Sequence, residues 1–128
     1  MTIDCGMFQD RQFLRRNWED CPVPQQSIDY LLLSHAHLDH SGLIPRLVDQ
    51  GFERPIITVK PSVKLTEIIM LDAGRIQEVD VVYKKRRHEK EKRRGAYPET
   101  PLYTEQDARK TLPLLGGLGY GEPVKLGD

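Results

Sequence analysis

The chain has 128 residues, enough for one compact domain with a single core that buries roughly two-thirds of the surface of the unfolded chain. Its 19 acidic and 19 basic side chains cancel to a net charge of zero. The overall charge therefore excludes a general attraction to nucleic acid, anionic lipid or acidic substrates, and any such preference must come from a local patch.

The sequence shows no basic start followed by an apolar run, and no stretch of about eighteen apolar residues. We therefore expect neither secretion nor contact with a membrane, and a cytoplasmic location. Two cysteines, Cys5 and Cys21, lack the spacing of a paired thiol motif, which fits a reducing compartment. We expect both to be small buried apolar side chains.

The first half of the chain predicts two strands joined by a loop. Thr2 and Ile3 have the residue types that end a strand, and Gly6 permits the turn that follows. The stretch to Pro24 has unevenly spaced apolar residues, which predicts a loop with about one helical turn. Residues 28–33 form a short apolar run typical of a strand covered on both faces.

A short helix is expected directly after the polar segment 34–40. Ser41 has a side-chain oxygen that can cap the helix start, Pro45 falls in the first turn, and Gly51 marks the end. Four residues form its apolar face: Leu43, Ile44, Leu47 and Val48.

A strand over residues 55–59 and a long helix come next. The helix is predicted from apolar residues at steps of three and four, which we expect to form one stripe facing the core. These residues are Leu65, Ile68, Ile69, Ala73, Ile76, Val79 and Tyr83. Gly74 should weaken the helix slightly.

Residues 84–101 predict a flexible, charged excursion. The run 84–94 has eight cations and two acids and could contact phosphates, although a solvated helix end is the favoured interpretation. Residues 95–101 add glycine and prolines.

The last part of the chain predicts a capped helix and a strand. Thr104 and Asp107 have the spacing of a capping box, and Pro113 should stop or kink the helix that they start. A glycine-rich connection then leads into a strand over 123–126, and residues 127–128 predict a hairpin turn. Strands alternating with helices indicate an α/β fold with parallel pairing.

The strongest chemical signal is a group of four donors after the strand at residues 28–33. His35 and His37 are two residues apart, so in an extended segment they point the same way and can bind one zinc ion. A tight turn after His37 would direct Asp39 and His40 to a second ion about 3.5 to 4 Å away. The carboxyl end of a strand is where α/β folds place their ligands. A solvated turn, or helix capping by Asp39, is the alternative.

Asp4 is a further candidate for this site, whereas His88 is not. Asp4 ends the first strand, and its carboxylate could accept a hydrogen bond from a metal-bound imidazole and fix the tautomer; an ordinary turn residue is the alternative. His88 lies within the charged run, and we expect it to be exposed to solvent.

The segment 34–45 resembles the His-x-His-x-Asp-His signature of the metallo-β-lactamase superfamily, in the form typical of its β-CASP RNA-processing nucleases. Residues 3–9 are similar to the first motif of that group, and residues 70–72, 76–78 and 101–104 are similar to its intervening segments. The resemblance spans almost the whole chain.

This resemblance implies an αββα sandwich, two zinc ions, and a bridging hydroxide that attacks the phosphorus of an RNA phosphodiester. It implies that His35 and His37 bind one zinc, that Asp39 and His40 bind the other and belong to the catalytic site, and that Asp4 supports them. Homo-oligomerisation stays open. Other hydrolases of the same fold, acting on thioesters, lactones or tRNA 3′ ends, share the four-donor signature and are the alternative.

The chain also departs from the family pattern. Relatives carry further strands before the segment at 3–9, and after the position of Asp128 another His ligand, a bridging Asp and a cap domain. We therefore expect residues 1–128 to form a partial sandwich that lacks N-terminal strands and the C-terminal half. With two histidines for the first ion, the isolated chain should bind metal weakly and be inactive, and a non-catalytic fragment that binds RNA or a partner through residues 84–94 is a further alternative.

Overall fold

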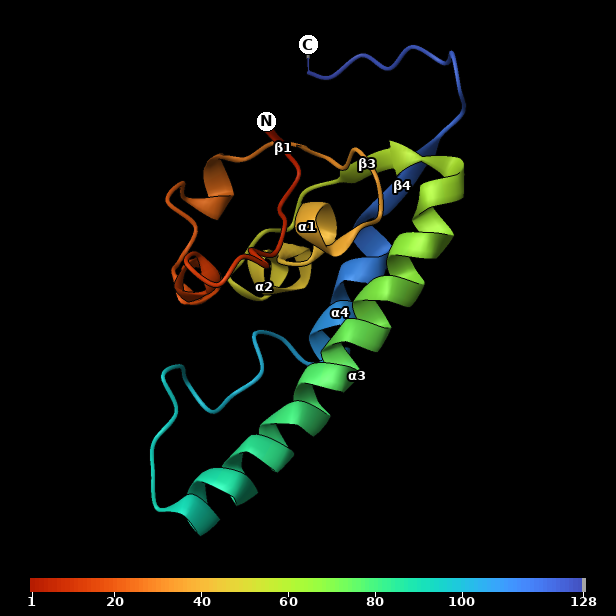
Figure 1. The fold of residues 1–128 in the computed structure, drawn as a ribbon. Coiled ribbons are helices and arrows are strands. Elements are labelled where there is room, and N and C mark those ends of the chain that lie inside the picture. The colour runs from red at the N-terminus through yellow and green to blue at the C-terminus, as the bar shows by residue number, and fades with distance from the viewer. Residues whose placement is uncertain (128) are drawn as a thin grey trace.

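The computed structural model describes residues 1–127 and shows a parallel four-stranded sheet covered by helices (Figure 1). The strands are β1 (Thr2–Ile3), β2 (Leu31–Leu32), β3 (Ile56–Val59) and β4 (Leu115–Leu118), in the spatial order β1-β2-β3-β4. The helices are α1 (Leu38–Ser41), α2 (Ile44–Asp49), α3 (Lys60–Glu91) and α4 (Glu105–Thr111). Short 3₁₀ turns are η1 (Leu14–Trp18), η2 (Gln25–Ser27) and η3 (Leu112–Leu114). This mixed α/β arrangement with a parallel sheet confirms the predicted fold class.

All three strand pairs are parallel. Leu31 of β2 lies opposite Thr2 on one side and Ile56 on the other, and Ile56 in turn lies opposite Leu115. The predicted strand at 28–33 is shorter in the structure, where β2 covers Leu31–Leu32, although Ile28 and Leu33 are buried beside it. The carboxyl end of β2 therefore has neighbouring strands on both sides, which holds the segment that follows it.

The core lies between the sheet and helices α2, α3 and α4. Its fully buried members include Leu31, Ile44, Phe52, Ile56, Met70 and Tyr103. The expected apolar face of α2 is confirmed, because Ile44 and Leu47 are buried. Both cysteines are free and half-buried, and they pack against this core rather than inside it.

The long helix α3 is confirmed, but the predicted core stripe is wrong. Ile68, Ile76 and Tyr83 are more than half exposed, whereas Thr66, Met70 and Gly74 are buried. The helix turns this face inward because α4 approaches it closely. A Cβ on Gly74 would lie 2.8 Å from the backbone of Thr104, so this glycine permits the contact between α3 and the start of α4.

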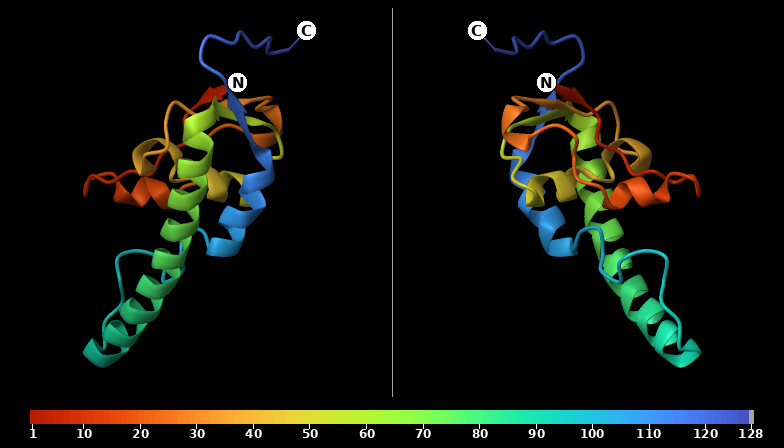
Figure 2. Two further views of the ribbon diagram at one scale, coloured as in Figure 1. Left: turned by 90° about the vertical axis from the view of Figure 1, so that its right-hand side faces the viewer. Right: turned by 90° about the vertical axis from the view of Figure 1, so that its left-hand side faces the viewer.

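The helix α3 is also longer than predicted and includes the first part of the charged run. Figures 1 and 2 show its distal half extending beyond α4, with the chain returning beside it through a loop. The interpretation of residues 84–91 as a solvated helix end is confirmed, because these side chains are exposed with the exception of His88. The expectation that His88 is exposed is wrong, since it is buried and lies 2.6 Å from Glu99.

The capping box at α4 is confirmed. The Thr104 side chain accepts a hydrogen bond from the Asp107 amide, Asp107 accepts one from the Thr104 amide, and the α-helix ends before Pro113. The predicted glycine-rich connection is wrong, because Gly116 and Gly117 belong to β4. Gly117 lies so close to Lys60 of α3 that a Cβ would be 3.0 Å from its Cα atom.

No strand forms over residues 123–126, where one was predicted, and this segment leads away from the sheet (Figure 1). Asp128 of the predicted hairpin turn lies outside the described residues. None of the helices within residues 1–127 is long and apolar enough to cross a membrane.

Candidate metal centre

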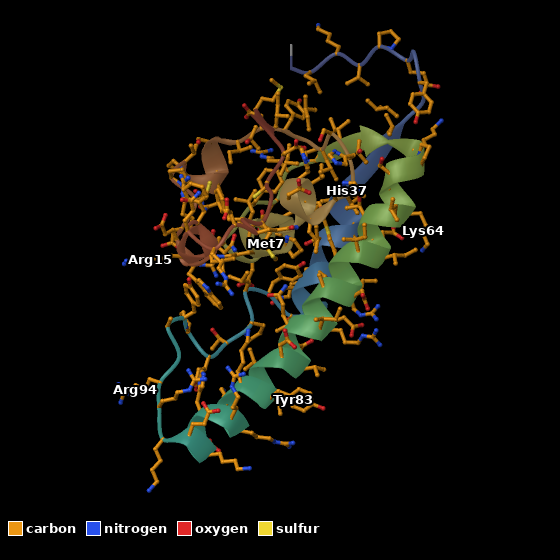
Figure 3. All side chains as sticks on the ribbon, in the orientation of Figure 1. Met7, Arg15, His37, Lys64, Tyr83 and Arg94 are labelled. Carbon is orange, nitrogen blue, oxygen red and sulfur yellow. The ribbon has the colours of Figure 1, made fainter. Side chains whose placement is uncertain are left out.

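The four predicted donors lie where β2 ends and α1 begins. The chain leaves the sheet through Ser34 and His35, bends at Ala36 and His37, and enters α1 at Leu38, which brings Asp39 and His40 into the first turn of that helix. Figure 3 shows His37 between α1 and the proximal half of α3. The bend and the helical turn that follows it therefore separate the four donors into two pairs.

The first pair is His35 and His37. Their rings meet edge to face with centroids 4.7 Å apart, and His35 Nε2 lies 3.2 Å from His37 Nδ1. Two nitrogens that bind one tetrahedral zinc ion at about 2.0 to 2.1 Å are themselves about 3.3 Å apart. The separation of the two imidazole nitrogens therefore fits two ligands of a single ion.

The second pair is Asp39 and His40. Asp39 Oδ2 lies 3.5 Å from His40 Nε2, which again is close to the spacing of two ligands of one ion. The rings of His35 and His40 are 4.0 Å apart between centroids, so the two pairs are neighbours. Within the residues that the structure describes, no three His, Cys, Asp or Glu side chains are grouped to hold a metal ion. The donors thus lie as two adjacent pairs.

Asp4 lies directly behind the second pair. Its Oδ2 accepts a hydrogen bond from His40 Nδ1 at 2.8 Å, and its Oδ1 accepts one from the Ser34 amide at 2.8 Å. Asp4 has a φ angle of +58°, a left-handed conformation that Asp adopts more readily than most residues. This turn aims the carboxylate back across β2 at His40.

The electrostatics of Asp4 favour its charged form. Partial burial raises the pKa of the carboxyl, but the hydrogen bonds from His40 and Ser34 outweigh this effect and hold the pKa of Asp4 below its usual value. A charged carboxylate at this place keeps the proton on His40 Nδ1, which leaves Nε2 of the same ring as the free donor atom.

Ser34 is a residue whose role the sequence did not indicate. Its hydroxyl lies 2.9 Å from Asp4 Oδ2 and 3.0 Å from His35 Nδ1. When the hydroxyl donates to the carboxylate, its oxygen can accept a hydrogen bond from the protonated Nδ1 of His35, which leaves His35 Nε2 free to bind a metal. The position of Ser34, between the predicted strand and the first histidine, is the sequence feature that could have indicated this role.

Backbone contacts hold the donor segment against the N-terminal segment. The Cys5 amide donates to the His40 carbonyl at 2.8 Å, and the Met7 amide donates to the Leu38 carbonyl at 2.8 Å. Between them, Gly6 approaches the chain so closely that a Cβ would lie 1.7 Å from the Asp39 carbonyl oxygen. Only glycine fits there.

Ser41 does not cap a helix, contrary to the prediction. It is buried at the end of α1, and its hydroxyl donates to the Ala36 carbonyl at 2.9 Å and is 3.0 Å from the His37 carbonyl. The start of α2 has no side-chain cap. Ser41 therefore ties the turn between the two donor pairs together.

Cys5 and His88 are not part of the donor cluster. Burial raises the pKa of the Cys5 thiol to about 12, so this thiol stays protonated at neutral pH and is a poor metal ligand. His88 lies at the distal end of α3 and pairs with Glu99.

A groove runs from the donors along α3. It has a volume of about 650 Å³, and it is lined by His37 and Asp39 on one side and by apolar residues of α3 such as Ile69 and Ile76 on the other. A ligand lying in this groove would contact the donor pairs with its polar part.

The grouping of the four donors at the end of β2 agrees with the protein family that the chain matches. The profile of the metallo-β-lactamase superfamily matches residues 3–121. The chain belongs to this superfamily. Members of the metallo-β-lactamase superfamily bind metal ions, usually zinc.

Similar curated proteins are named for RNA-directed roles. A ribonuclease of Thermus thermophilus is 30% identical over 127 residues, which cover 99% of this chain and 24% of that protein. A transcription termination factor of Cenarchaeum symbiosum is 26% identical over 94% of this chain and 17% of its own length. A probable RNase of Methanocaldococcus jannaschii is 33% identical over 62% of this chain and 18% of its length.

The comparisons confirm the resemblance of this metallo-β-lactamase chain to the β-CASP RNA-processing group. The chain spans about a quarter or less of the length of these three relatives. The individual metal ligands that we predicted from the sequence stay a prediction.

Proposed function

We propose that the chain is part of a zinc-dependent RNA-processing nuclease that cleaves phosphodiester bonds. The observation that carries this proposal is the arrangement of the donors in two pairs, with His35 Nε2 and His37 Nδ1 3.2 Å apart and Asp39 Oδ2 and His40 Nε2 3.5 Å apart. In the proposal, the first pair contributes to one zinc ion and the second pair to a neighbouring one.

The proposed donor atoms agree with the hydrogen bonds of the surrounding residues. Asp4 binds Nδ1 of His40, and Ser34 lies against Nδ1 of His35, so that in both rings Nε2 is left for the metal. Metal-bound histidines usually donate their other ring N–H to a carboxylate or another oxygen. His35 and His40 are thus supported in the way that zinc ligands require.

A zinc ion at such a site lowers the pKa of a coordinated water to about 7 and polarises an oxygen of the substrate. The chain's own residues would orient the donors, and Asp4 would keep the proton on His40 at Nδ1. The groove beside His37 and Asp39 would bind the substrate next to the donors. RNA is the proposed substrate because two of the relatives are named as ribonucleases and another as a transcription termination factor.

Two ligands from each pair fall short of the three protein ligands that a catalytic zinc ion usually has. We therefore propose that the isolated 128-residue chain binds zinc weakly and has negligible activity. The remaining ligands would come from elsewhere in an intact enzyme.

Zinc titration and a nuclease assay test the proposal. Calorimetric titration of the purified protein should give zinc binding that the double variant His35→Ala, His37→Ala abolishes, whereas His88→Gln, which removes the histidine outside the cluster, should leave it unchanged. The intact enzyme should cleave RNA but not small thioesters or lactones. The double variant should lose this cleavage, and His88→Gln should retain it. Equal zinc binding by all three proteins would refute the metal assignment.

A further inference from the structure

A second groove lies beside the distal half of α3. It has a volume of about 570 Å³ and is enclosed by three segments of the chain: the N-terminal loop at residues 7–18, the helix at 81–88 and the return loop at 93–102. Figure 3 marks two of its walls, with Met7 on the N-terminal loop and Arg94 on the return loop, while Tyr83 projects from the other side of α3. The predicted metal ligands do not line it.

The lining of this distal groove combines aromatic rings with cations. Phe8, Trp18 and Tyr97 contribute the rings, and Trp18 is half-buried whereas Tyr97 is 40% exposed. The cations are Lys84, Arg87 and Arg93. Within residues 1–127, neither Lys84 nor Arg87 forms an ion pair with an acidic side chain.

The walls of the distal groove are held in place by contacts within the protein. Buried His88 lies 2.6 Å from Glu99, which fixes the return loop to the helix. Gly95 packs so tightly on the His88 ring that a Cβ added to Gly95 would lie 2.6 Å from the Cε1 atom of His88. On the opposite wall, the Asn17 side chain bonds both the amide and the carbonyl of Phe8, each at 2.8 Å. The groove therefore exists before a ligand binds.

The distal groove neighbours the groove at the donor cluster. Met7 and Gln9 line both of them, so a chain-like ligand could reach from one to the other. One end of such a ligand would lie among the aromatic rings and cations of the distal groove, and the other end would lie next to His37 and Asp39.

We propose that the distal groove binds nucleotides of single-stranded RNA upstream or downstream of the bond at the metal centre. Aromatic side chains stack on unpaired bases, and nearby cations neutralise the phosphates that link them. Trp18 and Tyr97 provide the surfaces for stacking, and Lys84 and Arg87 bind the phosphates. That the substrate is RNA rests on the proposed function. The new elements are the place where the RNA is held and the requirement that it be single-stranded.

Binding of a labelled oligouridylate of about ten nucleotides tests the proposal, because single-stranded sites commonly span about 4 to 16 nucleotides. Fluorescence anisotropy is measured in EDTA, so that the strand is not cut. The double variant Lys84→Ala, Arg87→Ala should weaken binding at least about five-fold and reduce the slope of log K against log salt by about 1.4, which corresponds to two phosphates. The matched control is Lys85→Ala, Arg86→Ala, which removes the same charge from the same helix outside the groove.

Two further measurements separate the groove from a general attraction to the helix. Tyr97→Ala should weaken binding at least about five-fold through lost stacking, and RNA should quench the fluorescence of Trp18, the single tryptophan. Duplex RNA of the same length should bind more weakly and leave the fluorescence unchanged. Equal losses in both double variants, or an unquenched Trp18 with full affinity in Tyr97→Ala, would overturn the proposal.

These outcomes are distinguishable from failure of the proposed function. Because binding is measured without metal, the anisotropy assay reports on the distal groove separately from zinc, whereas the variant His35→Ala, His37→Ala is tested for loss of zinc binding and cleavage. Cleavage that persists in this variant would refute the metal assignment alone. Cleavage that depends on the two histidines, together with RNA affinity that is insensitive to Lys84, Arg87 and Tyr97, would refute the distal groove alone.

Discussion

The donor cluster and the distal half of α3 are held in place by different forces. Around the donors, the N-terminal segment at 4–7 is joined to the segment at 34–43 by backbone hydrogen bonds, and Gly6 lets the two chains touch. Around the distal half of α3, exposed charged residues surround buried His88, which pairs with the partly exposed Glu99. The donor geometry therefore depends on close backbone packing, whereas the distal groove depends on a few side chains.

This difference suggests that the two regions can be altered separately. A site that must hold ligand atoms to within a fraction of an ångström needs a stiff backbone, whereas a groove that binds a flexible strand can tolerate movement. Substitutions in one region should therefore leave the property of the other intact, which makes the comparison testable.

The largest effect is expected for Gly6→Ala. Its new Cβ would lie 1.7 Å from the Asp39 carbonyl oxygen, and because that oxygen belongs to the backbone the two segments must separate. We expect a loss of about 3 kcal/mol or more in the free energy of unfolding, measured by urea denaturation. Gly116→Ala is the matched control, because its Cβ would be 3.8 Å from the nearest atom outside its chain neighbours. Similar stability of both variants would contradict the close packing at the donors.

The next effect concerns zinc affinity. Asp4→Asn keeps a side chain that tolerates the positive φ angle of +58° but removes the charged acceptor for His40. We expect zinc affinity to fall about 10- to 100-fold, as for other partners of metal-bound histidines, with little change in RNA binding. Calorimetry with zinc measures this, and exposed Asp29→Asn is the control. Unchanged affinity in Asp4→Asn would show that Asp4 does not support the metal.

A smaller effect is expected in the distal region. His88→Ala removes a buried hydrogen bond to Glu99 and should cost about 1.5 kcal/mol. It should also release the return loop, so that trypsin cuts faster at Arg93 and Arg94, while zinc binding stays as it was. Lys90→Ala, an exposed change in the same turn, is the control. Loss of zinc binding in His88→Ala would show that the two regions are coupled.

The smallest effect concerns α4, which packs against both α2 and α3. Partial burial raises the pKa of Asp107, but hydrogen bonds from Thr104 and Lys110 outweigh it and hold that pKa below its usual value. The folded state therefore gains stability from Asp107 above the ordinary carboxyl pKa of about 4, and this gain is lost as the pH falls through the lowered value.

Asp107→Asn should accordingly cost about 1 kcal/mol at neutral pH, as expected for a helix cap. The difference from the unchanged protein should shrink when thermal unfolding is followed into acid below about pH 4. A difference that is the same at every pH would mean that the charge of Asp107 contributes nothing.

The sequence by itself determined the elements whose signals are local. The capping box at Thr104 and Asp107 and the strand at 55–59 were both predicted, because each depends on neighbours within a few residues. The superfamily was also evident from the donor motif and its surroundings. Spacing alone also predicted that His35 and His37 would point the same way.

Only the tertiary structure decided which face of each element is buried and which distant residues meet. The core face of α3 includes Gly74 rather than its exposed Ile76, because α4 approaches there, and β4 contains Gly117 because α3 leaves no room for a side chain. His88 is buried because a loop eleven residues away returns to it with Glu99. Such contacts join residues far apart in the chain, so no local pattern of residue types records them.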